Sequence, residues 1–103
     1  MAGSTGPVAV SASGTSGVLQ AANGARVGLQ VYNTDTASTL YLTYGATSTT
    51  ALYTVAIPPG GYFEMPYSQE TDGSIETIYQ GVVSGIWGGS PTGKAMMTET
   101  YIS

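Results

Sequence analysis

Apolar and polar residues alternate along short stretches of the chain, and this is the pattern of half-buried β-strands. Val27, Leu29 and Val31 occupy every second position of one such stretch, and a period of two places successive side chains on opposite faces of a sheet. Residues 33–38 are rich in Asn, Asp, Ser and Thr, which favour turns. A second alternating stretch follows at 39–44. We therefore predict that these two strands form a hairpin.

The second half of the chain repeats this arrangement of short strands and strong turns. Strands are predicted at 52–57 and 62–65, and the sequence Pro-Pro-Gly-Gly between them breaks the first, because proline cannot donate a backbone hydrogen bond. Residues 78–87 carry apolar side chains at both alternating sets of positions, which predicts a central strand covered on both sides. A Gly-rich turn at 88–93 leads to a last strand at 94–101, and a second hairpin is expected there.

These elements predict an all-β fold. No window shows an apolar stripe of helical period, and six to eight short strands separated by turns are typical of a small antiparallel β-sandwich or barrel, in a jelly-roll-like arrangement. The expected domain covers residues 25–103.

Residues 1–24 are predicted to form an extended N-terminal arm. The segment is rich in Gly, Ala, Ser and Thr, and its strand character is confined largely to Pro7-Val8-Ala9-Val10. Two interpretations remain open: a disordered leader, which is common at termini of this composition, and an arm that adds a strand to the sheet edge of a neighbouring molecule.

The chain is poor in charge, and its few charged residues are mostly acidic. Charged residues make up 8% of the 103 residues, and only Arg26 and Lys94 are positive. A formal net charge of −4 does not suit a phosphate backbone or an anionic membrane surface, so we expect neither nucleic acid nor membrane as a partner. A surface of Ser, Thr, Gly and Tyr instead suits burial against other protein.

The residue types of most catalytic and metal sites are missing. The sequence contains neither histidine nor cysteine, which excludes the common triads, thiol nucleophiles and ordinary zinc sites. The segment 88–94 fits part of a phosphate-binding loop, but Ala95 replaces the required Ser or Thr and a strand is predicted where a helix is needed. We therefore expect no enzyme, no catalytic residue and no cofactor.

Four carboxylates gather in the region 64–76, namely Glu64, Glu70, Asp72 and Glu76. A pair of them could in principle hydrolyse a glycoside, but that chemistry needs a deep cleft, which a domain of this size hardly offers. The loop could also hold calcium, although it lacks the alternating ligands of an EF-hand. A solvated acidic loop is the favoured interpretation, and we predict no metal site.

Aromatic residues are the most informative class, with eight tyrosines, one phenylalanine and one tryptophan. Tyrosine suits protein interfaces and sugar-binding platforms equally, while cross-strand packing explains most of these residues. The residues that we expect at an interface are Val8, Val10, Arg26, Tyr32, Tyr79 and Trp87.

Several segments together resemble a group of short virion proteins of tailed bacteriophages. The segments are 26–33, 40–42, Tyr53, 58–66, 79–87 and 93–99. The likeness covers about residues 25–101, and its motifs are a turn and two strand endings, so it bears on structure more than on the exact role.

The resemblance implies a β-rich accessory protein of the virion without catalytic residues. Its favoured form is a head decoration, or cement, protein that binds the major capsid protein on the exterior of the capsid and stabilises the head. A homo-oligomer is expected, with a trimer favoured because capsomers meet at three-fold positions. The alternative is a component of the tail, baseplate or fibre, or a β-sandwich module that binds host glycans.

Overall fold

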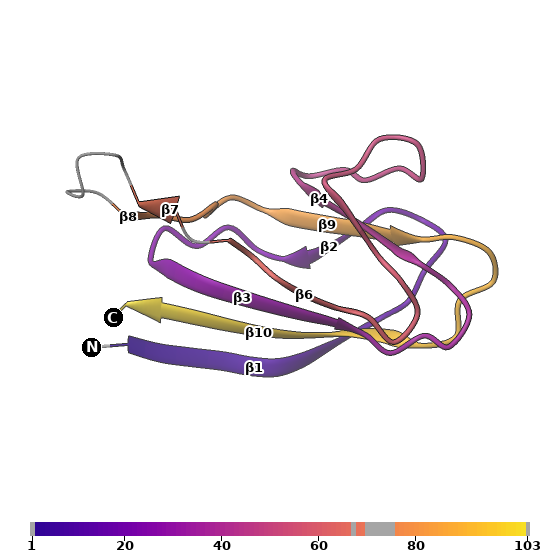
Figure 1. Ribbon diagram of the computed structural model, residues 1–103, viewed down its shortest axis with the longest axis horizontal. Coiled ribbons are helices and arrows are strands. Elements are labelled where there is room, and N and C mark those ends of the chain that lie inside the picture. Colours follow the sequence, from indigo (N-terminus) through magenta and orange to yellow (C-terminus); the bar gives the residue numbers. More distant parts are fainter. Residues whose placement is uncertain (1, 67, 70–75, 103) are drawn as a thin grey trace.

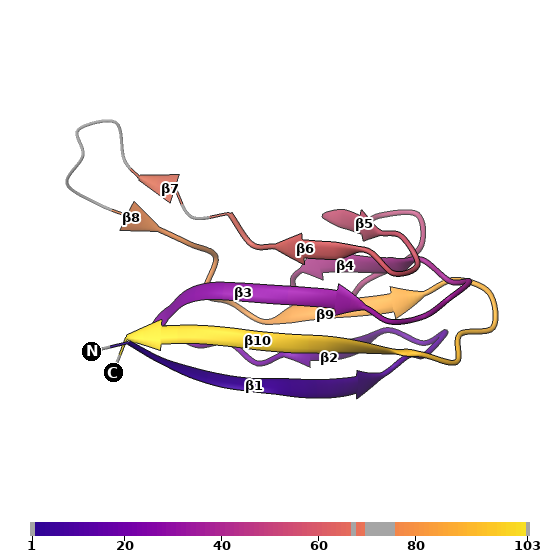
Figure 2. The same cartoon turned by 60° about the horizontal axis from the view of Figure 1, so that its bottom comes forward.

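Eight strands form two four-stranded antiparallel sheets that face each other as a sandwich (Figures 1 and 2). The computed structural model describes residues 2–66, 68–69 and 76–102. The strands of the first sheet, here called the β1 sheet, are β1 (Ala2–Ser11), β10 (Lys94–Ile102), β3 (Arg26–Asn33) and β6 (Tyr62–Glu64), in that spatial order. Those of the second, the β2 sheet, are β2 (Gly17–Gln20), β9 (Val83–Trp87), β4 (Leu40–Tyr44) and β5 (Val55–Ile57).

The strand order is that of a jelly roll. Apart from β4 and β5, strands that follow one another in these two sheets lie in opposite sheets, so the chain winds around the core instead of folding into neighbouring hairpins. Two nested Greek keys of this kind define the jelly-roll arrangement. The predicted antiparallel sandwich with jelly-roll-like topology is therefore confirmed, and the barrel alternative is wrong because the two sheets stay separate.

Both predicted hairpins are wrong, although their strands exist. Strand β3 pairs with β10 and β6, while β4 pairs with β9 and β5. The last two strands of the chain are separated in the same way, with β9 in the β2 sheet and β10 in the β1 sheet. In both cases the polar connection crosses between sheets instead of reversing within one. Strand β9 lies between β2 and β4 and is thus central, as predicted, but it covers only Val83–Trp87 of the strand predicted at 78–87.

The predicted N-terminal arm is part of the sandwich. Strand β1 pairs antiparallel with β10 from Ala2 opposite Ile102 to Ser11 opposite Lys94, and β2 pairs with β9. Leu19 of β2 is buried in the core. The segment is therefore neither a separate leader nor an arm in this structure, because its strand-forming residues find an edge in each sheet of their own chain.

The core lies between the two sheets and is built from the inward positions of both. Its buried apolar residues are Leu19, Leu29, Val31, Leu40, Leu42, Ile57, Met65, Val83, Trp87, Ala95 and Met97. Gly85 on β9 is needed for close packing, because a Cβ atom there would lie 2.6 Å from Cδ1 of Leu19 and 2.9 Å from Cδ1 of Leu40. Each fully buried large apolar side chain contributes roughly 1.5–3 kcal/mol.

A short two-stranded ribbon lies beyond one end of the sandwich (Figure 1). It consists of β7 (Ser68–Gln69) and β8 (Glu76–Thr77). Of the acidic residues in this region, Glu70 and Asp72 lie outside the described residues, and so does most of the calcium loop considered above. The described chain contains no helix that is long and apolar enough to cross a membrane.

Candidate functional site

Most of the charged side chains that the structure describes are buried in the sandwich. The structure describes the side chains of five charged residues, and three of these are buried: Arg26, Asp35 and Glu99. Only Glu64 and Lys94 are exposed among the five. Because burying a charge costs free energy unless it is paired or hydrogen-bonded, each buried group must have a specific set of partners.

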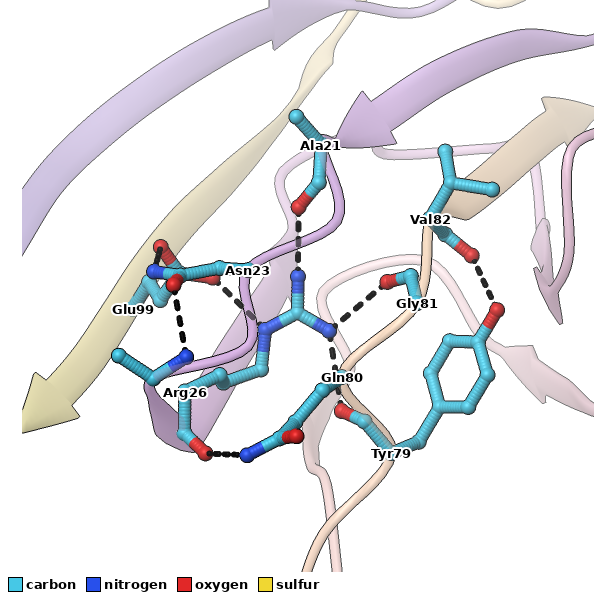
Figure 3. Close-up of polar contacts among 9 residues, drawn as sticks. Ala21, Asn23, Arg26, Tyr79, Gln80, Gly81, Val82 and Glu99 are labelled. Atoms are coloured by element: carbon cyan, nitrogen blue, oxygen red, sulfur yellow. Dashed lines mark hydrogen bonds and ion pairs between the residues drawn. The ribbon is translucent and has the colours of Figure 1, made fainter.

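Arg26 is completely enclosed, and all three nitrogens of its guanidinium group donate hydrogen bonds (Figure 3). Its Nε donates to Oε2 of Glu99 at 2.7 Å. Its Nη2 donates to the carbonyl oxygen of Ala21 at 2.7 Å, and its Nη1 to those of Tyr79 and Gly81, both at 3.0 Å. The ion pair is therefore completed by three backbone acceptors, which is the condition under which a buried charge is tolerated.

The residues around this ion pair extend the network, here called the arginine cluster. Asn23 donates to the second carboxylate oxygen of Glu99 at 3.1 Å, and Gln80 donates to the carbonyl oxygen of Arg26 at 3.1 Å. The cluster thus joins β3 and β10 of the β1 sheet to the β2–β3 loop and to the segment between β8 and β9 (Figure 3). It closes the end of the sandwich from which the β7–β8 ribbon projects.

Asn33 is the last residue of β3 and Trp87 is the last residue of β9. Together they form a second polar group, at the end of β3 away from Arg26. The Asn33 amide nitrogen donates to the carbonyl oxygens of Ser38, Ile57 and Pro58 at 3.0–3.2 Å. Its side-chain oxygen accepts from Trp87 Nε1 at 3.1 Å. A fully buried amide thereby binds the β3–β4 connection, the end of β5 and the indole of β9.

Asp35 connects two loops through its carboxylate. Oδ1 accepts the backbone N–H groups of Ala37 and Ser38 at 2.8 and 2.7 Å, and Oδ2 accepts those of Thr92 and Gly93 at 2.7 and 2.9 Å. These four hydrogen bonds hold the pKa of the Asp35 carboxyl far below its usual range. The turn predicted at 33–38 is thus confirmed, and the same side chain fixes the β9–β10 connection as well.

Acid is expected to destabilise the fold through Asp35. Because folding lowers the pKa of this carboxyl, the stabilisation is complete above the ordinary value of 3.8 and is lost progressively as the pH falls below it. Urea unfolding between pH 7 and pH 2 should show this loss. The Asp35→Asn variant should be less stable at pH 7, and its stability should depend less steeply on pH. A variant with the same acid dependence as the wild type would contradict this role.

Two of the interface candidates are in the interior, so that prediction is wrong for them. Arg26 is 0% exposed and Trp87 is 2% exposed, because both complete polar groups inside the domain. Val10 and Tyr79 are half-buried and pack against the core, and the Tyr79 ring stacks on that of Tyr44 with 4.7 Å between ring centres.

Val8 and Tyr32 remain exposed, at 44% each, but they are not brought together. Val8 pairs with the core residue Met97, which places it on the inward face of β1 at the open edge of the sandwich. Tyr32 is on the outer face of β3, because its neighbour Val31 points into the core. The six candidates therefore do not form one surface.

A continuous row of side chains crosses the outer face of the β1 sheet, and sequence reasoning found only one member of it. The cross-strand pairs place Ala9, Met96, Tyr32 and Tyr62 side by side on β1, β10, β3 and β6. Tyr62 is 57% exposed. We call these four residues the tyrosine row. The alternation of Tyr62 and Glu64 around Phe63 could have indicated that Tyr62 points outward. Only the pairing of β3 with β6 shows that Tyr62 lies beside Tyr32.

The outer face of the β2 sheet is different, because the 45–54 loop folds over it. The Ser48 hydroxyl donates to the carbonyl oxygen of Tyr41 at 2.8 Å. The same hydroxyl is hydrogen-bonded to that of Thr43 at 2.7 Å. The Tyr53 ring lies against that of Tyr41, with 4.8 Å between ring centres. Of the two outer faces, that of the β1 sheet is thus the less covered by the described chain.

The described residues show neither a pocket nor a group of three or more metal-ligating side chains. Lys94, at the end of the loop that partly fits a phosphate-binding motif, is exposed and begins strand β10, so the strand predicted there is confirmed. Comparisons with protein family models, curated proteins and solved structures gave no match. The most distinctive surface of the described chain is therefore the outer face of the β1 sheet, which carries the tyrosine row together with the two exposed charges, Lys94 and Glu64.

Proposed function

We propose that the protein is a bacteriophage capsid decoration protein, which binds the major capsid protein on the outside of the head and stabilises it. The observation that carries the proposal is the scarcity of exposed charge: three of the five described charged side chains are buried, and the outer face of one sheet presents tyrosine, methionine and small side chains. Depletion of charge together with exposed Tyr and Met is the composition of interface cores.

Further support comes from the fold. Jelly rolls are common among viral capsid domains, although a fold alone does not define a function. A domain of about a hundred residues without disulfides has a narrow stability margin. Binding to a lattice of capsid protein stabilises such a domain by mass action, and occupation of many equivalent sites would in turn hold neighbouring capsomers together.

The exposed tyrosines favour one alternative, a tail or fibre component that binds host glycans. Tyr32 and Tyr62 lie opposite each other on neighbouring strands, and both are exposed. Exposed aromatic rings can pack against sugars. A glycan-binding role predicts retention of the isolated domain on a glycan array, and absence of the protein from purified heads.

The number of copies per particle distinguishes these functions. Quantitative mass spectrometry of purified virions, with the major capsid protein as internal standard, should find on the order of hundreds of copies of a lattice-bound decoration protein, as expected for closed symmetric shells of repeated subunits. Purified heads separated from tails should retain it. A few copies per virion, confined to the tail fraction, would contradict the proposal and support the alternative.

A further inference from the structure

The only two exposed charges among the described side chains lie on the same surface and have opposite sign. Lys94 is on β10 and Glu64 is on β6. Both point outward from the β1 sheet, because their neighbours Ala95 and Phe63 point toward the core. The tyrosine row runs between the two charges.

Their positions are related by Tyr32. Strands β10 and β6 flank β3, one on each side. On β6, Glu64 is opposite Gln30, which precedes Tyr32 by two residues along β3. On β10, Met96 is opposite Tyr32, and Lys94 lies two residues from Met96 in the direction away from Gln30. Lys94 and Glu64 therefore lie diagonally across the face at equal numbers of strands and residues from Tyr32.

This arrangement is self-complementary under a two-fold rotation. Consider an axis that lies between two facing β1 sheets, passes over Tyr32 and is perpendicular to the line from Lys94 to Glu64. Rotation about it places Lys94 of each copy opposite Glu64 of the other and brings the two Tyr32 side chains together. A two-fold interface uses the same patch on both subunits, and this patch has complementary charges in the required positions.

We propose that two copies of the chain associate face to face through the outer surfaces of their β1 sheets. The tyrosine row forms the centre of the contact, and two Lys94–Glu64 pairs form its rim. The four strands have 10, 9, 8 and 3 residues. At about 4.8 Å between strands and about 3.4 Å per residue they present a face on the order of 500 Å². Two such faces bury about 1,000 Å², which is the size of a weak, reversible interface.

The dimer concerns the free protein and does not rest on the proposed role in the capsid, but it covers the same outer face that supports the capsid contact. One copy therefore cannot make the capsid contact and the dimer contact through this face at the same time. The dimer is an even-numbered assembly, whereas lattice symmetry alone favours a trimer, so the number of copies in solution decides between them.

A charge-reversal experiment tests the proposed pairing. Sedimentation equilibrium of the wild type should show a monomer–dimer equilibrium. Lys94→Glu alone, and Glu64→Lys alone, each place like charges opposite one another twice and should weaken the dimer at least about tenfold. The double variant Lys94→Glu/Glu64→Lys restores both pairs with reversed polarity and should bring dimerisation back to within about threefold of the wild type. Circular dichroism confirms that each variant is folded.

A matched control adds charge elsewhere. Leu52 is 79% exposed on the 45–54 loop, which covers the outer face of the other sheet, so Leu52→Glu should leave dimerisation unchanged. A monomeric wild type, a trimer, or a double variant that stays as weak as the single variants would each overturn the proposal.

Discussion

Replacement of Arg26 by methionine should destabilise the fold by about 3–5 kcal/mol, because it leaves the buried Glu99 carboxylate without its counter-charge. Glu99 is 4% exposed and accepts the Nε hydrogen of Arg26 at 2.7 Å. The variant also removes the donors that satisfy three backbone carbonyl groups. Since small domains are stable by only about 5–15 kcal/mol, a large part of the stability would be lost. Urea unfolding followed by tryptophan fluorescence measures the change.

The double variant Arg26→Met/Glu99→Leu separates the penalty of an unpaired charge from the value of the ion pair. Apolar replacement of both partners removes the unpaired charge, so the double variant should regain the part of the stability that the buried carboxylate costs. The part that comes from the three carbonyl groups left without a donor should remain lost. If Arg26→Met alone changed the free energy of unfolding by less than about 1 kcal/mol, the arginine cluster would not hold the end of the sandwich together as described.

The Asn33→Asp variant should lose about 3 kcal/mol or more at pH 7, although the two side chains have nearly the same shape. The amide nitrogen of Asn33 donates to three backbone carbonyl oxygens. A carboxylate would direct a negatively charged oxygen at those acceptors in a fully buried position. Protonation would restore a donor, so the stability difference from the wild type should shrink when the pH is lowered from 7 to 4. Urea titrations at both pH values measure it.

Gln30→Glu is the matched control, because it makes the same change of amide to carboxylate on the same strand at an exposed position. The new carboxylate lies opposite Glu64 on β6, so the variant should lose up to about 1 kcal/mol, still well below the loss expected for Asn33→Asp. An Asn33→Asp variant as stable as this control at pH 7 would show that the amide is not the donor that connects the β3–β4 loop, β5 and Trp87.

Alternation along the chain located the strands but could not assign their partners. The strand predicted around Val27, Leu29 and Val31 corresponds to β3, and that predicted at 39–44 corresponds to β4. The period of two reflects burial of one face, which is the same for a hairpin and for two strands in opposite sheets. The choice between them depends on contacts with strands far away in sequence, such as β10 against β3. For the same reason the N-terminal segment was predicted to form an arm.

The candidate site was predictable only in its local parts. A turn was predicted at 33–38, and Asp35 stabilises it by accepting from Ala37 and Ser38. Its bonds to Thr92 and Gly93 join residues 57 and 58 positions apart, which no local pattern indicates. Arg26 was expected at an interface. Its position beside a register shift between β3 and β10, opposite Tyr101, turns its side chain inward to Glu99.

The pairing of the first strand with the last has a consequence for the speed of folding. Strand β10 lies between β1 and β3 in the sheet, so neither β1 nor β3 can pair there until β10 is present. The chain therefore has to close loops of sixty residues or more before the largest gains in contact energy are made. Domains dominated by such distant pairings typically fold in milliseconds to seconds. During synthesis, the β1 sheet can form only after the C-terminal strand has left the ribosome.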